Sequence, residues 1–514
     1  MKVLFLMRHA GFVRNFESTL RLLAERGHEV RVRFDGPFGT AGDRPAIVER
    51  LAAEEPRLSF GPAPDRSGEP WFALGRRLRL AVDYLRFLAP AYADAPKLRA
   101  RAEARVGRLV RVLGRSAARR PGGAEALARA LRDLDAALPV SRRAARLVDR
   151  ERPDAVLVTP LVELGEPQTD YLRAARSAGV PTGLCVASWD NLTNKGSIPE
   201  IPDLVAVWND AQRREAVGLH GVPAARVVAT GAPTYDQWFA WEPSRDRASF
   251  LGRVGLPEER PVILYLCSSE FIAPDEAGFV RRWLAALRAR PEPELREAAV
   301  LVRPHPQNAA QWRDADLDAL GAVTVWPPAG ADPVDAASRR DYFDSIHFSA
   351  AVVGVNTSAL IETAIVGRPV LTQLAPEFRD TQGGTLHFAH LSEGGALRAA
   401  GSFEEHAEQL AAALSAPAAG RDASADAFLR SFVRPHGLEE AATPRLVDAI
   451  EALAAVVPDP PGVPAAAPLL RVLLAPAAAL AWLEAGARRR APALIRRTLG
   501  ARATEAAARR LARP

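Results

Sequence analysis

Residues 354–370, GVNTSALIETAIVGRPV, place small polar residues where a buried strand gives way to a helix. The apolar run AAVVGV stops at Asn356, Thr357 and Ser358, and Glu362 follows about one turn later. A helix N-terminus offers free N–H groups and the positive end of the helix dipole, so it favours an anion such as phosphate. The hydroxyls add donors, and Glu362 is placed to accept hydrogen bonds from a sugar's vicinal hydroxyls. The alternative is that Ser358 simply caps the helix, although Glu362 stands four residues on, where a capping box requires three.

A second strand end carries side chains of the same chemistry. The run AVLVRPHP places Arg303 and His305 where a buried strand stops. Arginine binds phosphate through a fixed planar fork, and histidine donates to a phosphate or a sugar hydroxyl. The alternative for His305 is an ordinary loop residue between two prolines. The run PVILYLCSS adds a hydroxyl pair at a third strand end. The predicted ligand-binding set of this half is therefore Arg303, His305, Asn356, Thr357, Ser358, Glu362, Ser268 and Ser269.

The first half of the chain has its own polar cluster, SWDNLTNKGSIP, directly after the strand-like run PTGLCVA. Asp190, Trp189 and Lys195 crowd this strand end, and Glu163 stands at another one, in TPLVELGEP. An aromatic face with carboxylates nearby suits a sugar ring. We therefore predict a sugar-contact surface here. The alternative is a plain turn, which Asp-Asn and Asn-Lys-Gly explain without any function.

The elements that must position these residues follow an alternating pattern. Short apolar runs alternate with helical segments in two series, one ending near Tyr235 and one beginning with PVILYLCSS. Near-continuous apolar runs are typical of strands buried on both faces of a parallel sheet. Ligands of such sheets bind at the carboxyl ends of the strands. The sequence thus predicts an α/β protein of two doubly wound, Rossmann-like domains that face each other across a cleft.

The predicted domain ranges follow from breaks in this pattern. An Arg- and Ala-rich region without strand signals predicts a helical insertion in the first domain, and WEPSRDRASF marks the boundary between the domains. The run VVPDPPGVP is a Pro-rich linker to a basic tail. The ranges are 1–240 for the first domain, about 71–150 for its insertion, 241–455 for the second domain, and 456–514 for the linker and tail.

The charge distribution argues against nucleic acid as a partner. Residues 461–514 hold ten arginines against Glu484 and Glu505, a net +8, which leaves −2 of the overall +6 for the rest of the chain. The body is therefore nearly neutral, and only the tail is basic. Asp-Ala-Asp at 314–316 lies in a helical pattern typical of a solvated face, so we expect no metal site and no cofactor.

The remaining sequence signals concern location. MKVLFLMRHAGF is apolar for only five residues before Arg8, which is shorter than the apolar region of a signal peptide. Cys185 and Cys267 lie inside apolar runs and suggest a reducing compartment. We therefore expect a cytoplasmic protein.

The order of the motifs in the second half resembles the nucleotide-binding half of GT-B glycosyltransferases. Strand-RPHP is followed by D-x-x-H-x-x-x-x-V-V-G-x-N-T-S-x-x-x-E-x-x-x-x-G-R-P-V, over roughly 261–385. The nearest groups are bacterial surface-polysaccharide enzymes, including the CDP-glycerol glycerophosphotransferase-like ones. The resemblance implies that the Arg-x-His-Pro and Thr-Ser positions contact donor phosphates and that the helix glutamate binds ribose hydroxyls. Many relatives have Asp where Asn356 stands.

The first half is similar to the same superfamily in outline. TGAPTYDQW resembles its hinge-side segment, and RHAGFVRNFES stands where acceptor domains often carry Gly and His. The resemblance implies that His9 and Arg14 face the cleft. The alternative for His9 is a loop histidine of no consequence.

These observations predict a metal-independent transferase that moves a sugar, or a sugar-like alcohol phosphate, from a nucleotide donor to a surface-polysaccharide or lipid-linked acceptor. If the reaction inverts, Asp190 or His9 acts as the base, and if it retains, no such base is required. Glu163, Trp189, Lys195 and Arg14 would contact the acceptor. Two rival functions stay open: a non-hydrolysing nucleotide-sugar epimerase, and a non-catalytic glycan-binding protein of the same fold.

The tail predicts a further partner. APLLRVLLAPAAALAWLEAG, residues 467–486, is apolar but interrupted by Arg471, Pro476 and Glu484, so we expect it not to span a membrane. Arginines cluster around apolar residues after it. A basic helix with an apolar side lies in the interface of an anionic membrane. This predicts peripheral attachment to the inner face of the membrane. The alternative is that residues 467–486 pack on the second domain and the rest is a disordered basic end.

Overall fold

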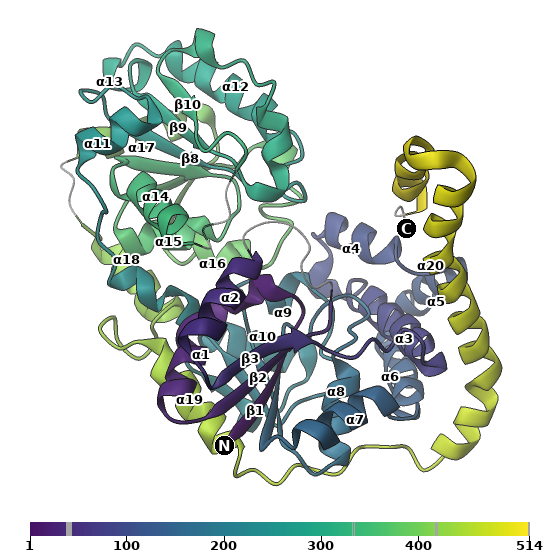
Figure 1. Ribbon diagram of the computed structural model, residues 1–514. Coiled ribbons are helices and arrows are strands. Elements are labelled where there is room, and N and C mark those ends of the chain that lie inside the picture. Colours follow the sequence, from purple (N-terminus) through teal and green to yellow (C-terminus); the bar gives the residue numbers. More distant parts are fainter. Residues whose placement is uncertain (37–43, 331–332, 334, 417–419, 512–514) are drawn as a thin grey trace.

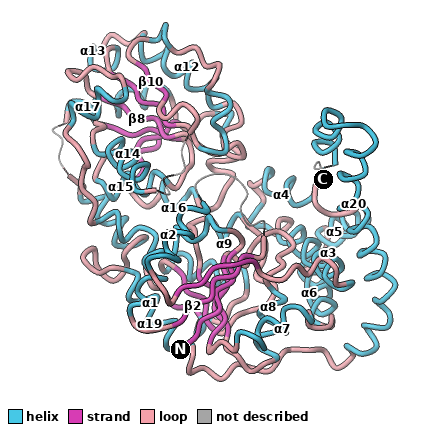
Figure 2. Tube along the Cα trace, viewed as in Figure 1, coloured by secondary structure: helices cyan, strands magenta, loops and turns pink. Residues whose placement is uncertain are grey.

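The computed structural model describes residues 1–36, 44–330, 333, 335–416 and 420–511. Two parallel sheets with helices on both faces form two halves of the molecule (Figure 1). The predicted α/β fold with two Rossmann-like sheets is therefore confirmed. Figure 2 shows the strands in magenta, those of the first sheet in the lower half of the view and those of the second sheet in the upper half.

The first sheet has seven strands in the order β3-β2-β1-β4-β5-β6-β7. Alternate residues of β1 enter the cores on opposite faces, Phe5 on one and Leu4 on the other. This explains the continuous apolar runs, because both faces of each strand are covered. The strands are β1 (Lys2–Met7), β2 (Glu29–Phe34), β3 (Leu58–Pro62), β4 (Ala155–Thr159), β5 (Thr182–Cys185), β6 (Leu204–Val207) and β7 (Val227–Ala229).

The second sheet has six strands in the order β10-β9-β8-β11-β12-β13. In each sheet the strand order reverses once, between β1 and β4 in the first and between β8 and β11 in the second. Such reversals open a crevice at the carboxyl ends of the strands. The strands are β8 (Val262–Leu266), β9 (Ala299–Arg303), β10 (Val323–Val325), β11 (Ala351–Gly354), β12 (Val370–Gln373) and β13 (Leu397–Ala400).

The helices divide between the two halves and the helical insertion. Those of the first half outside the insertion are α1 (Val13–Glu25), α2 (Arg44–Glu54), α8 (Thr169–Ser177), α9 (Asn191–Asn194) and α10 (Asp210–His220). Those that follow in the chain are α11 (Arg247–Val254), α12 (Glu276–Arg288), α13 (Pro293–Arg296), α14 (Ala336–His347), α15 (Ala359–Val366), α16 (Phe388–Ser392), α17 (Phe403–Ser415), α18 (Ala423–Phe432), α19 (Ala442–Leu453) and α20 (Ala467–Leu511).

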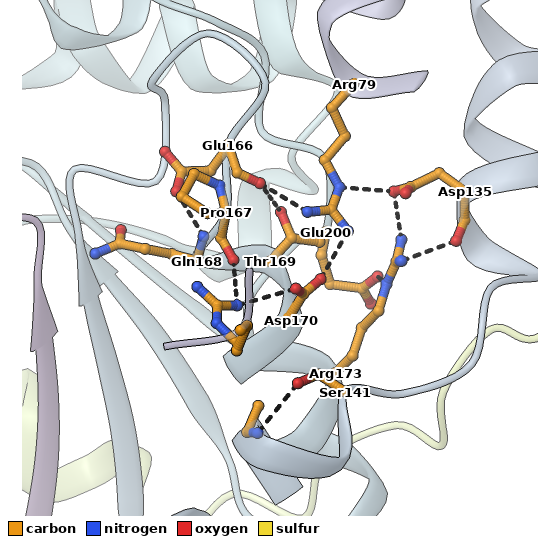
Figure 3. A network of polar contacts seen from close by, with 12 residues as sticks. Arg79, Asp135, Ser141, Glu166, Pro167, Gln168, Thr169, Asp170, Arg173 and Glu200 are labelled. Carbon is orange, nitrogen blue, oxygen red and sulfur yellow. Dashed lines mark hydrogen bonds and ion pairs between the residues drawn. The ribbon is translucent and has the colours of Figure 1, made fainter. Parts of the chain in front are cut away.

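The region without strand signals is helical, as predicted. It contains α3 (Pro70–Arg86), α4 (Pro96–Glu103), α5 (Arg108–Ala118), α6 (Gly123–Ala136) and α7 (Arg142–Glu151). The insertion is held to the first half by a buried ion network of Arg66, Arg79, Asp135, Asp170, Arg173 and Glu200. Figure 3 labels the members of this network other than Arg66.

Arg79 of α3 is the centre of this buried ion network. Its Nε donates to Asp135 Oδ2 at 3.1 Å, and its Nη2 donates to Asp170 Oδ1 at 2.8 Å. Arg173 donates to the same Asp135 oxygen at 2.8 Å. Arg79, Asp135 and Arg173 are all buried. Because charges removed from water must be paired, the network fixes α3 and α6 against α8.

The helix α19 returns to the first half, although its residues fall within the predicted range 241–455. Leu446, Val447 and Ile450 are buried in the core of the first sheet. Asp236, in the segment resembling a GT-B hinge, accepts hydrogen bonds from the N–H groups of Ala442 and Thr443 at 2.9 and 2.7 Å. Asp236 therefore fixes the start of the returning helix. The second range thus includes a helix that packs on the first domain, and the boundary at 240/241 stays a prediction.

The tail helix α20 packs on the insertion. Ala478 and Ala481 are buried against Leu74 of α3 and Leu138. The alternative that residues 467–486 pack on the second domain is therefore wrong. Within the described residues, one helix, residues 467–490, is long and apolar enough to cross a membrane, with 11% of its most apolar window buried. We expected Arg471, Pro476 and Glu484 to disqualify this segment as a membrane span. The mean hydropathy of the helix is nevertheless high enough to pass the length and composition criteria.

Candidate functional site

Two contiguous cavities lie between the carboxyl ends of the two sheets. The larger has a volume of about 480 Å³ and the smaller about 280 Å³. Both sizes are in the range of small-molecule sites or their subsites. Side chains from both sheets line them, so a ligand there would touch both halves. The residues common to the two cavities are Arg14, Asn15, Ser188, His305, Pro306, Thr357 and Ser358.

The start of α15 forms part of both cavities. Ser358 stands at the cap position, but its side chain accepts no capping hydrogen bond and its backbone is already helical, at φ −60° and ψ −21°. The capping alternative is therefore not realised. Thr357 is half-buried and Ser358 is exposed, and both line the two cavities. The N–H groups and hydroxyls at this helix start can donate to an anion.

Asn356 has a different position. Its side-chain amide donates to the backbone oxygen of Thr381 at 2.5 Å and to Thr385 Oγ1 at 3.2 Å, and the residue is only 3% exposed. Asn356 lines the larger cavity while holding the segment after β12 against the end of β11. A carboxylate at this position would accept hydrogen bonds but could not donate them to Thr381.

Arg303 lines the smaller cavity but is largely occupied by protein partners. Its Nη1 donates to Ser345 Oγ at 2.8 Å and lies 3.3 Å from Asp341 Oδ2, and the residue is 5% exposed. Its guanidinium also lies over the ring of Tyr342, at 4.9 Å from the centroid. Burial lowers the pKa of Arg303, against the carboxylate of Asp341. In this conformation Arg303 is a buried part of the cavity wall. Its predicted contact with a donor phosphate therefore stays a prediction.

His305 and Glu362 reach the cavities directly. His305 Nδ1 accepts from the N–H of Gln307 at 3.2 Å, and the residue lines both cavities. Glu362, one turn into α15, lines the smaller cavity, and its Oε2 accepts from the Tyr342 hydroxyl at 2.5 Å. That hydrogen bond orients the carboxylate toward the smaller cavity that Glu362 lines.

The two serines after β8 separate. Ser269 lines the larger cavity. Ser268 is fully buried, its N–H donates to Glu276 Oε2 at 2.8 Å, and it lines neither cavity. The predicted ligand contact of Ser268 is not formed in this conformation, because Ser268 is buried and its hydroxyl accepts from the N–H of Asn356 at 3.4 Å.

The wall from the first sheet brings the predicted residues of that half together. His9 follows β1, and Asp190 and Lys195 follow β5; all three line the larger cavity, as do Arg14 and Trp189. Trp189 is 4% exposed and packs edge-to-face on His387, with ring centroids 4.5 Å apart. Its indole is therefore largely covered by protein and mainly supports the wall.

Asp190 is the carboxylate of this wall. Burial alone would raise its pKa, but Lys195, His387 and the hydroxyl of Ser188 together hold the pKa below its ordinary value. The Ser188 hydroxyl donates to Asp190 Oδ1 at 2.7 Å. Asp190 is thus ionised at neutral pH and can accept a proton or a hydroxyl hydrogen bond.

Glu163 does not line either cavity. It is half-buried, and its backbone N–H donates to Glu166 Oε2 at 2.8 Å. The predicted contact of Glu163 with an acceptor is therefore not formed directly. Its carboxylate still acts on the site at a distance, because it favours the charged form of Arg101 in the cavity wall.

Among the residues of the larger cavity that sequence reasoning missed are Arg101 and His387. Arg101 comes from α4 of the insertion; it donates to the backbone oxygen of Asn194 and lies 4.9 Å from the ring centroid of Phe271 in the other half. Nothing in an Arg- and Ala-rich sequence distinguishes it from its neighbours. His387 lies just before α16, and burial lowers its pKa to about 4. Its only sequence signal is its position after a Gly-rich turn.

Aromatic residues line the rest of the smaller cavity. They come from the loop after β7 and from α14, and they include Tyr235, Trp238, Trp241 and Tyr342. Trp238 packs edge-to-face on Tyr342, with centroids 5.6 Å apart. Among the described residues no group of three or more His, Cys, Asp or Glu side chains is placed to hold a metal ion.

The comparisons with known proteins agree with this architecture. The model matches UDP-GlcNAc 2-epimerase from Methanocaldococcus jannaschii with a TM-score of 0.50 and 10% identity, over 88% of this chain and 100% of that one. It matches the UDP-GlcNAc-bound 2-epimerase from Neisseria meningitidis with a TM-score of 0.50 and 11% identity, over 88% and 100%. A glycosyltransferase from Rickettsia africae matches with a TM-score of 0.50 and 10% identity, over 88% and 99%.

These structures share the GT-B architecture, and the chain has the GT-B fold. At such low identity the likeness establishes the fold and leaves the reaction to be argued from the site. No protein-family model and no curated protein sequence matches the chain.

Proposed function

We propose that the protein transfers a sugar, or a sugar-like alcohol phosphate, from a nucleotide-activated donor to an acceptor bound against the first domain. The carrying observation is that two chemically different walls meet in one contiguous space between the sheets. The second half contributes N–H and hydroxyl groups that can donate hydrogen bonds to phosphate, together with the Glu362 carboxylate. The first sheet contributes Asp190 with cationic side chains around it.

The donor side is argued from the contacts at α15 and β9. The helix start with Thr357 and Ser358 can bind the donor's phosphates together with His305. Glu362, oriented by Tyr342, accepts from ribose hydroxyls. The aromatic residues of the smaller cavity offer faces for the base. These groups supply positive charge and donors for the leaving phosphate, so we propose that no metal or cofactor is needed.

The acceptor side is argued from the first wall. Lys195 and Arg101 place two cations in the larger cavity close to Asp190. A carboxylate beside cations suits an acceptor that carries both a hydroxyl and a phosphate. A glycan or a lipid-linked sugar phosphate has both groups. In this proposal Asp190 takes the proton of the attacking hydroxyl, which implies inversion, and His9 lies on the same wall.

An acceptor-dependence experiment tests this function. The protein is screened by thermal shift against UDP-, GDP-, CDP- and dTDP-sugars, and each stabilising donor is then incubated with and without a lipid-extracted acceptor pool. We expect nucleotide release that depends on the acceptor. A donor that binds but is never consumed with any acceptor pool contradicts the proposal.

An epimerase is the second candidate, because two of the matched structures are UDP-GlcNAc 2-epimerases. This reaction needs no acceptor. Incubating the protein with UDP-GlcNAc alone and following the sugar protons by NMR distinguishes the two reactions. Appearance of the 2-epimer without acceptor favours the epimerase. Among the described residues, Asp190 is the one carboxylate that lines the larger cavity, and this favours the transferase over an epimerase with several acidic groups.

A further inference from the structure

Two exposed apolar stripes lie on the helices that pack against α3, outside the cleft. On α5, Leu109, Val112 and Leu113 are 71%, 65% and 48% exposed. Their spacing of i, i+3 and i+4 puts them on one face of the helix. The opposite face is packed, because Gly114 is buried against Tyr84 and Leu85 of α3. The stripe is therefore a surface feature that no other described element covers.

The tail helix α20 has the same two-sided construction. Leu469, Val472, Leu473, Leu480 and Leu483 are 56–72% exposed and share one face at i, i+3, i+4, i+11 and i+14. The other face carries the buried Ala478 and Ala481, which contact α3 and its surroundings. Figure 1 shows α20, in yellow, running along the outer side of the insertion. We refer to the exposed apolar faces of these two helices as the apolar flank (Leu109, Val112, Leu113, Leu469, Val472, Leu473, Leu480 and Leu483).

Arginines border the apolar flank. Arg108, Arg115 and Arg119 are exposed and recur at i, i+7 and i+11, along one edge of the α5 stripe. Arg488, Arg489 and Arg490 are exposed at the end of the described side chains of α20. Of these, Arg115 contacts the carboxylate of Glu103, and Arg489 acts electrostatically on Asp65. The border is thus strongly positive, and it complements an anionic surface that has an apolar interior.

The packing of α20 decides between lying on a bilayer and crossing it. Arg471 Nε donates to the backbone oxygen of Ala137 at 2.7 Å, and Glu484 pairs with Arg77 of α3 at 2.5 Å. These contacts hold one side of the helix along the folded domain for more than three turns. A crossing helix would have to leave these partners and bury both ionic groups in hydrocarbon. A helix held in this way can insert only its exposed leucines.

We propose that the apolar flank is a docking surface for an anionic lipid bilayer, in which α5 and α20 lie in the interface and do not span it. The inference goes beyond the proposed function and does not depend on it. The flank is joined to the cleft through the chain: Arg101 lines the larger cavity, and Arg108 begins α5 seven residues later.

Vesicle flotation of the full-length protein tests this proposal. The vesicles are phosphatidylcholine alone or phosphatidylcholine with about one third phosphatidylglycerol. We expect flotation with the anionic vesicles, weakened by high salt, and little with the neutral ones. Leu109→Ser/Val112→Ser/Leu113→Ser and, separately, Leu473→Ser/Leu480→Ser/Leu483→Ser should each lower the bound fraction about tenfold or more.

A matched triple variant controls for loss of exposed apolar surface in general. Val217, Val228 and Leu374 are also exposed but lie on other elements, so changing all three to serine should leave flotation unchanged. Equal flotation of the wild type and both flank variants would overturn the proposal. Equal flotation with neutral and anionic vesicles would also overturn it. So would a dimer that forms without lipid and dissociates in the flank variants, because the flank would then be a protein interface. Thermal shifts of the flank variants with nucleotide sugars should match those of the wild type. A failure of the docking proposal is therefore distinguishable from a failure of the transferase proposal.

Discussion

The buried ion network and the first-sheet wall of the larger cavity both gather charged residues around the first sheet, but they pair their charges differently. In the network every carboxylate meets a guanidinium within 3.1 Å, as between Arg79, Asp135 and Asp170. In the cavity wall, the ammonium of Lys195 has no hydrogen-bond or ion-pair partner among the described residues, although it acts on Asp190 electrostatically. Saturated pairing is what a structural cluster needs, and unsaturated charge facing a cavity is what a ligand can use.

The largest expected effect breaks the cavity side of this comparison. Asp190→Asn keeps the shape of the side chain but removes its ability to take a proton. Turnover with a productive donor and acceptor should fall by roughly 10²–10⁴, with little change in donor affinity. His9→Gln provides the matched test of the other base candidate. Near-normal turnover in both variants would reject an Asp190 base and leave a retaining reaction as the better account.

The network side is tested by stability. Arg79→Met leaves Asp135 and Asp170 without their shared partner, so the free energy of unfolding should drop by about 3–5 kcal/mol. Arg77→Met is the matched control, because Arg77 lies on the same helix and pairs with Glu484 where both side chains are over 40% exposed. That change should cost about 0–1 kcal/mol. If urea unfolding showed the same loss of stability for both variants, the network would not stabilise the fold more than an exposed ion pair does.

His387 gives the comparison a pH dependence. Burial lowers its pKa from 6.5 to about 4, against Asp190, while His390 and Lys195 add to the lowering. A lowered histidine pKa means that its stability contribution is full above pH 6.5 and is lost as the pH falls towards 4. Between pH 7.5 and 5 the wild type should lose on the order of 2 kcal/mol more than His387→Asn. If the free energy of unfolding of the two proteins changed equally with pH, the claim that His387 is buried in its neutral form would be refuted.

The sequence predicted the two-sheet fold because continuous apolar runs and their order depend on local patterns. Most of the predicted site residues line the two cavities for the same reason, since strand ends of a parallel sheet meet at one edge. It could not separate Ser268 from Ser269, or see that Arg303 is bonded to Ser345, because those outcomes depend on tertiary packing. Arg101 could not be predicted from the sequence, because the insertion reaches the cleft only when residues distant in sequence hold α3 in place.

The contacts between the insertion and the second half show the same limit. Lys97 of α4 donates to the backbone oxygen of Phe271, and Arg101 lies over the same ring. On the other side of the cleft, Arg339 of α14 pairs with Glu17 of α1 at 2.9 Å. None of these contacts has a sequence signature, because each joins residues at least 170 positions apart.

The central claim is that a nucleotide-activated donor binds between the two sheets, with Glu362 holding its ribose. Calorimetric titration of the donor with the largest thermal shift, into the wild type and Glu362→Ala, tests it most directly. The variant should bind about 1–3 kcal/mol more weakly. Glu377→Ala, a solvent-exposed carboxylate paired with Arg282 in the same half, should bind like the wild type. Unchanged affinity in a folded Glu362→Ala protein, or no binding of any nucleotide sugar by the wild type, would contradict the account.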